Sequence, residues 1–205
     1  MGDYLPDHAK IERYKSALYS ISENLDPLRT QASWCFELWP DGEGRKCADI
    51  LFGADDAIDD STLALCAFVE MEWPESTDQR QLLGYGFFQA LYIQQEAIVA
   101  IAHAGDITMD LKAQPATWKL RTLRNRLVGH PAPDKMDWSV SGIFGRGDIT
   151  PNQIGYSVYS AGDHGFHIDP NDLATSQFKE LAPIVDKAVE NIWKKWGHVL
   201  KGYDQ

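Results

Sequence analysis

Apolar residues recur along the first part of the chain at alternating steps of three and four, the spacing of one face of an α-helix. The stripe consists of Ile11, Tyr14, Leu18, Ile21, Leu25 and Leu28. It predicts an amphipathic helix over residues 7–28. Residues 29–39 continue the pattern as a second, shorter helix, and the Pro- and Gly-containing segment 40–44 breaks it.

The middle of the chain predicts a long helix at the centre of a bundle. Ser76 or Thr77 can cap a helix that runs to about Ala104, and most of this segment is apolar on nearly every side. Before it, the nearly all-apolar run 63–69 fits a helix, and a buried strand is the alternative. The acidic run 53–60 predicts a loop.

Three polar residues interrupt the long apolar helix at seven-residue intervals. They are Gln89, Glu96 and His103. A buried carboxylate costs several kcal/mol unless a cation pairs with it, so a buried Glu96 needs Arg121 or Arg124 of the next helix. In the alternative, Glu96 and its neighbours Gln94 and Gln95 face water or a partner subunit.

The segment 117–131 predicts a helix that ends at a histidine. Its apolar stripe consists of Leu120, Leu123 and Leu127. Gly129 can end the helix and Pro131 cannot continue it, so His130 lies just past its end. Arg124, at the border of the stripe, can share a pocket with His130, which would join a permanent cation to a group that titrates near neutral pH. The alternative is an arginine that complements the helix dipole and a solvated histidine.

The same segment is an island of positive charge in an acidic chain, whose net charge is −11. Five cations fall between 112 and 126 with no acidic residue among them: Lys112, Lys119, Arg121, Arg124 and Arg126. The net charge argues against a protein that wraps nucleic acid by charge alone, whereas this island would attract an anionic ligand. A solvated helix face is the alternative interpretation.

Beyond residue 133 the pattern changes to short β-branched and aromatic runs separated by turn residues. The runs are 138–143, 154–160 and 165–168, and Arg146-Gly147-Asp148 reads as a turn between the first two. A small antiparallel meander follows from this pattern. Asn171 or Asp172 can then cap a final helix. Pro183 either kinks this helix or marks the first turn of its main segment.

Length and composition indicate one domain over residues 1–205, because a chain with 44% hydrophobic residues can bury a substantial core. No apolar run is long enough for a membrane span and the first residues resemble no signal peptide, so we expect a cytoplasmic protein. No metal or organic cofactor is indicated, since His164 and His167 would point to opposite faces of a strand. The cysteines show neither a disulfide framework nor zinc-site spacing; they are Cys35, Cys47 and Cys66.

The run from Arg124 through Asn125 to His130 resembles the motif of the HEPN superfamily (higher eukaryotes and prokaryotes nucleotide-binding), an Arg and a polar residue followed after four positions by a His. The family carries this motif at the end of the third helix of an α-helical bundle, after a long apolar helix that often holds an acidic residue, here Glu96. The resemblance implies a mainly α, up-and-down bundle. The meander at about 138–168, before the C-terminal helix, departs from the minimal family fold.

The resemblance implies a metal-independent ribonuclease of toxin–antitoxin or phage-defence systems, which would be active as a homodimer whose two motifs meet across a two-fold axis. His130 would act as acid or base, Arg124 would stabilise the charge on the phosphate, and Asn125 would orient the phosphate or His130. The residues expected to bind RNA are Lys119, Arg121 and Arg126. The alternatives are a catalytically silent dimer that binds a nucleotide, RNA or a protein such as an antitoxin, and a structural subunit of a larger assembly.

Overall fold

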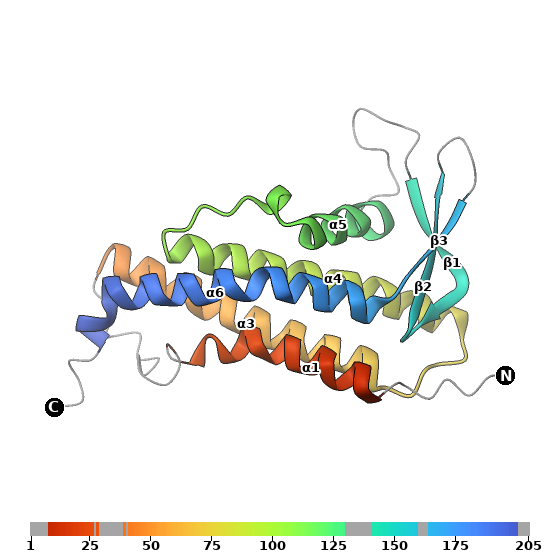
Figure 1. The fold of residues 1–205 in the computed structure, drawn as a ribbon, viewed down its shortest axis with the longest axis horizontal. Coiled ribbons are helices and arrows are strands. Elements are labelled where there is room, and N and C mark those ends of the chain that lie inside the picture. Colours follow the sequence, from red (N-terminus) through yellow and green to blue (C-terminus); the bar gives the residue numbers. More distant parts are fainter. Residues whose placement is uncertain are drawn as a thin grey trace.

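The computed structural model describes residues 8–26, 28, 39, 41–129, 141–159 and 164–200. Within them the fold is mainly helical, with a small antiparallel sheet before the C-terminal helix, as the sequence predicts (Figure 1). The elements in chain order are α1 (His8–Glu23), α3 (Glu43–Glu70), α4 (Thr77–Ala104), the 3₁₀ helix η2 (Leu111–Ala113), α5 (Pro115–Arg124), the π-helix η3 (Asn125–Gly129), β1 (Ser141–Thr150), β2 (Gln153–Tyr159), β3 (His164–Ile168) and α6 (Pro170–Leu200).

Helix α4 is the centre of the bundle, as its all-round apolar pattern predicts. It packs against α3, α5, α6 and β1. Its buried side chains include Phe87, Phe88, Leu91, Ile98 and Ile101. The helix begins at Thr77 after Ser76, where the sequence predicts its start, although the Ser76 side chain makes no capping hydrogen bond. No helix in the described part of the chain is long and apolar enough to cross a membrane.

The acidic run 53–60 is helical, so the prediction of a loop there is wrong. It lies inside α3, and the run 63–69 continues the same helix instead of forming a strand. Ala54 and Ile58 face the core. The acidic side chains between them face outward, so this stretch is the solvent face of an amphipathic helix. Its exposed acidic residues are Asp56, Asp59 and Asp60.

The N-terminal helix is shorter than the apolar stripe predicts. Helix α1 ends at Glu23, and Asn24 and Leu25 form a turn in which Leu25 N donates to Ser22 O at 3.0 Å. Leu25 and Leu28 still reach the core, and the backbone is helical again at Asp26 and Leu28, so a turn interrupts the single helix that the stripe predicts. The second helix predicted over 29–39 lies outside the described residues except for Trp39, which is buried.

The three strands form an antiparallel sheet in the order β1-β2-β3, which confirms the meander. The segment read as a turn, 146–148, lies inside β1, where the register shifts between Phe144 and Ile149. A bulge therefore replaces the predicted turn. The sheet packs on α4 at Gly84, where an added Cβ would lie 2.9 Å from the Ile149 side chain, and the Trp73 Nε1 donates to Ile149 O at 3.0 Å.

Helix α6 closes the bundle against α1, α4 and α5. Its N-terminus is capped by Asp169, whose Oδ1 accepts from the backbone N of Asn171 at 2.9 Å and of Asp172 at 3.3 Å. The expectation that Asn171 or Asp172 is the cap is therefore wrong by two or three positions. Pro183 lies within the helix. Two cysteines, Cys47 and Cys66, are buried free thiols.

Candidate functional site

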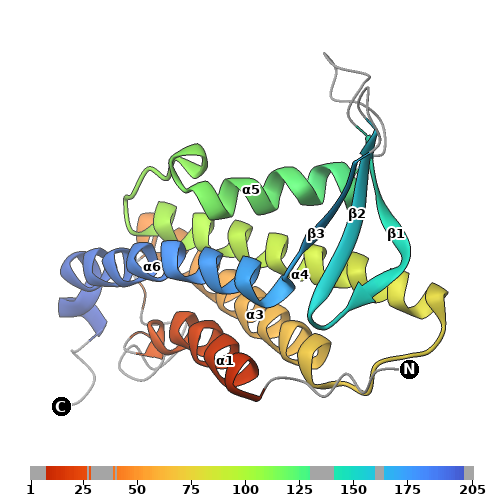
Figure 2. The ribbon, with the colours of Figure 1, turned by 45° about the vertical axis from the view of Figure 1, so that its right-hand side comes forward.

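The leucine stripe predicted for α5 seats this helix against the bundle. Leu120, Leu123 and Leu127 are all buried. Arg121 contacts Glu96 of α4, whereas Arg124, three positions later on α5, contacts the earlier residue Gln89. The two helices are therefore antiparallel. Figure 2 shows α5 alongside α4, with its C-terminal end at the sheet.

A carboxylate from α6 holds the N-terminus of α5. Glu180 accepts hydrogen bonds from the backbone N of Ala116 and of Thr117, both at 2.9 Å, and from the Thr117 hydroxyl at 3.0 Å. These are donors that the first turn of a helix leaves without intrahelical partners, and the negative charge complements the helix dipole. Sequence reasoning missed this contact because nothing local to 115–117 points to a residue on another helix.

A buried amide pair fixes the other side of the same turn. The Gln95 Nε2 donates to Thr117 O at 3.2 Å and also to the Gln177 side chain. Gln177 in turn donates to Leu91 O at 3.4 Å. Helices α4, α5 and α6 are thus joined by one polar network, which sets how far along α4 the arginines of α5 stand.

Arg124 makes three contacts, two with α4 and one with the residue that follows it. Its Nη2 donates to Gln89 Oε1 at 2.9 Å, its Nη1 donates to Asn125 Oδ1 at 3.1 Å, and the guanidinium carbon lies 4.2 Å from the centre of the Tyr92 ring. None of these partners is charged, and no carboxylate among the described residues pairs with Arg124. Its positive charge therefore remains available to an anion.

Arg121 lies on the same tyrosine but is neutralised. Its Nη1 donates to Glu96 Oε1 at 2.6 Å, its Nη2 donates to the Tyr92 hydroxyl at 3.3 Å, and its guanidinium carbon lies 4.8 Å from the ring centre. Of the two arginines that the sequence offered as partners for Glu96, the structure pairs Arg121 with it. The Glu96 side chain is 48% exposed, so the pair lies at the surface.

Tyr92 is the residue that sequence reasoning missed. Its ring makes cation–π contacts with both guanidinium groups, and its hydroxyl accepts a hydrogen bond from Arg121. The signal available in the sequence was its position between Gln89 and Glu96, on the line that faces α5. The alternative in which Glu96, Gln94 and Gln95 face water is right for Glu96, which is exposed, and wrong for Gln94 and Gln95, which are fully buried.

The remaining motif residues lie where α5 changes its helical form. The Asn125 backbone N donates to both Arg121 O and Thr122 O, and from there the chain continues as a π-helix to Gly129. Such wide turns recur at functional sites. Asn125 is exposed, and His130 lies outside the described residues.

The residues predicted to bind RNA differ in exposure and in whether a carboxylate neutralises them. Lys119 and Arg126 are exposed, whereas Arg121 is engaged with Glu96. Helix η3, which carries Arg126, packs against β1 of the sheet. Burial raises the pKa of the Tyr156 phenol on β2, and the positive charge of Arg126 opposes that rise. His103, the third member of the polar line, lies about 21 Å along α4 from Gln89 and takes no part in the site.

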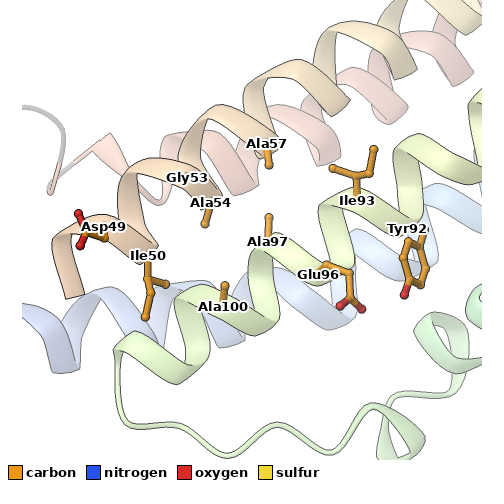
Figure 3. Close-up of a pocket in the computed structure, with 10 residues that line it drawn as sticks. All are labelled: Asp49, Ile50, Gly53, Ala54, Ala57, Tyr92, Ile93, Glu96, Ala97 and Ala100. Atoms are coloured by element: carbon orange, nitrogen blue, oxygen red, sulfur yellow. The ribbon is translucent and has the colours of Figure 1, made fainter. Parts of the chain in front are cut away.

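A groove of about 360 Å³ adjoins the site on the opposite side of α4 (Figure 3). Its floor between α3 and α4 consists of small apolar residues, and the acidic residues that line it are Asp49 and Glu96. No Lys or Arg is among the described residues that line this groove, so an anion would find a positive charge on the face toward α5 instead.

Comparison of the chain with family models, curated proteins and solved structures gives no match to any of them.

Proposed function

We propose that this protein is a metal-independent endoribonuclease of the HEPN type. The observation that carries the proposal is Arg124, a guanidinium stacked on Tyr92, oriented by Gln89 and left without a carboxylate partner in the described structure. It stands six positions before His130 in a stretch that resembles the family motif. A cation held in this way suits the charge that builds on a phosphate in the transition state.

The proposed reaction is attack of an RNA 2′-hydroxyl on the adjacent phosphate. The oxygen–phosphorus bond to the next nucleotide breaks, leaving a 2′,3′-cyclic phosphate and a 5′-hydroxyl. His130 would take the proton from the attacking hydroxyl or give one to the leaving oxygen. Gln89 and Asn125 occupy two of the four terminal N–H groups of Arg124, which leaves the other two for phosphate oxygens.

The wider biology of the proposal follows the family that the motif resembles. Two copies of the chain would form a homodimer with a composite site across a two-fold axis. The enzyme would act in the cytoplasm, in phage defence or under the control of an antitoxin, and would use no metal or organic cofactor.

The test is cleavage of mixed, end-labelled RNA in EDTA by the purified protein and by Arg124→Ala and His130→Ala. We expect losses of about 100- to 1000-fold for Arg124→Ala, from removal of one transition-state donor, and about 100- to 10,000-fold for His130→Ala, from loss of acid–base catalysis. Arg124→Lys should also be impaired, because an ammonium lacks the planar fork. Products from the wild type should carry cyclic phosphate ends.

His103→Ala is the matched control, since His103 is exposed and distant from Arg124. It should cleave like the wild type. Circular dichroism must show that all variants are folded. An Arg124→Ala or His130→Ala protein that cleaves at the wild-type rate refutes the proposal. Binding of RNA by a wild type that never cleaves it also refutes the nuclease and leaves a binding module at the same site.

A further inference from the structure

An exposed tryptophan, Trp118, lies on α5 three positions before Arg121 and six before Arg124. The Trp118 side chain is 40% exposed, and the Lys112 ammonium lies 5.5 Å from the centre of its ring. A large aromatic ring at the surface beside a cation is a surface on which an unpaired base can stack, with the cation close to the neighbouring phosphate.

A second aromatic surface lies on the sheet, where α5 ends. The rings of Tyr156 and Phe166 are stacked, with centroids 5.5 Å apart and planes at 24°. They face each other across β2 and β3, and Phe144 is the partner of Tyr156 on β1, so the three aromatic residues form one row. Phe144 is buried against α4, whereas Phe166 is 44% exposed at the outer end of the row.

The two aromatic surfaces are linked by positive charge. Lys119 and Arg126 are exposed on α5 and η3, and residues 111–129 contain no acidic residue. Trp118 and Arg126 are separated by about 12 Å along the helix. Helix η3, which carries Arg126, packs against β1, and this contact connects the cations to the sheet. Arg124 lies on α5 between Trp118 and the end of the helix at the sheet.

We propose that single-stranded RNA lies along α5 and η3, with one base stacked on Trp118 and another on Phe166 on either side of Arg124. The ligand is the substrate of the proposed function, and in that respect the inference rests on it. Bases within a duplex have no free face for such rings, so the surface selects single strands. Stacking reads no base edges, so little sequence preference is expected. The sheet, which the minimal family fold lacks, thereby acquires a role in holding substrate.

The test separates binding from cleavage by using a labelled, single-stranded 2′-O-methyl oligoadenylate, which lacks the attacking hydroxyl. Its affinity is measured by fluorescence anisotropy for the full chain and for Trp118→Ala and Phe166→Ala. Each variant should bind about 5- to 150-fold more weakly, the usual effect of removing one stacking ring. Trp118→Phe and Phe166→Tyr should restore most of the affinity, and a duplex of the same length should bind more weakly than the single strand.

Tyr19→Ala is the matched control, because Tyr19 is 42% exposed on α1, which carries none of the proposed RNA contacts. It should bind as the wild type does. Equal affinities for Trp118→Ala, Phe166→Ala and the wild type overturn the inference, and so does a wild type that binds no single strand. If such a protein still cleaves RNA in EDTA, the proposed function holds and only the stacking surface is refuted. If the wild type binds through these rings and never cleaves, the binding surface stands and the nuclease falls.

Discussion

Replacement of Glu180 by alanine tests the contact that positions the whole candidate site. The variant removes the acceptor of three hydrogen bonds from the first turn of α5 and leaves two backbone N–H groups there without a partner. Loss of a helix cap costs about 1 to 2 kcal/mol, and the interaction of the charge with the helix dipole adds about 0.3 to 1 kcal/mol. We therefore expect the free energy of unfolding to fall by about 1.3 to 3 kcal/mol.

The measurement is urea unfolding followed by circular dichroism, with the slope of the transition compared between proteins. For a chain of this length the melting temperature should fall by about 3 to 12 °C. Hydrogen exchange adds local resolution, since the amides of Ala116 and Thr117 should lose protection first. Cleavage should also fall, because α5 carries Arg121 and Arg124.

Glu190→Ala is the control on the same helix. Glu190 forms exposed ion pairs with Lys187 and Lys194, and the two lysines hold the pKa of that carboxyl at about 2. Exposed pairs of this kind contribute little to stability, so the change should be much smaller than for Glu180→Ala. A Glu180→Ala protein as stable as the wild type, with unchanged exchange in α5, would show that the carboxylate does not hold this helix.

Three further predictions concern packing, pH and charge. Gly105→Ala should cost about 1 to 3 kcal/mol, because its Cβ would lie 2.7 Å from a backbone atom of α6. Gly53→Ala, whose Cβ meets nothing within 4 Å, should be neutral or stabilise α3 by up to about 1 kcal/mol; thermal melts that rank the two variants equally contradict this. Burial raises the pKa of Cys47 from 9.0 to about 11, so the unfolded thiol ionises first and the fold should lose stability from pH 9 to 11. Urea melts of Cys47→Ala across that range should lack this loss of stability. If the variant and the wild type show the same pH profile, the buried thiol is not its cause. Glu96→Gln should leave Arg121 uncompensated and tighten binding of the single-stranded probe, with a steeper salt dependence. Unchanged salt dependence would show that Arg121 does not contact the strand.

The local sequence pattern predicted the elements whose buried residues follow the spacing of a helix and those whose β-branched and aromatic runs lie between turn residues. The long helix ending at Ala104, the leucine stripe of α5 and the three-stranded meander were all predicted from it. The same reasoning failed at 53–60, since acidic composition suggested a loop while Ala54 and Ile58 supplied a buried face at helical spacing. Composition is a weaker guide than periodicity in such a segment.

For the candidate site, too, some properties follow from the local sequence and others only from the tertiary structure. The sequence by itself determined that Arg124 stands on a helix six positions before His130, in a segment without acidic residues, because those properties depend only on neighbours along the chain. Only the tertiary structure decided that Arg121 is neutralised by Glu96 while Arg124 is not, and that Tyr92 binds both guanidinium groups. These contacts depend on the offset between α4 and α5. That offset is set by buried polar bonds from residues distant in the chain, which no local pattern encodes.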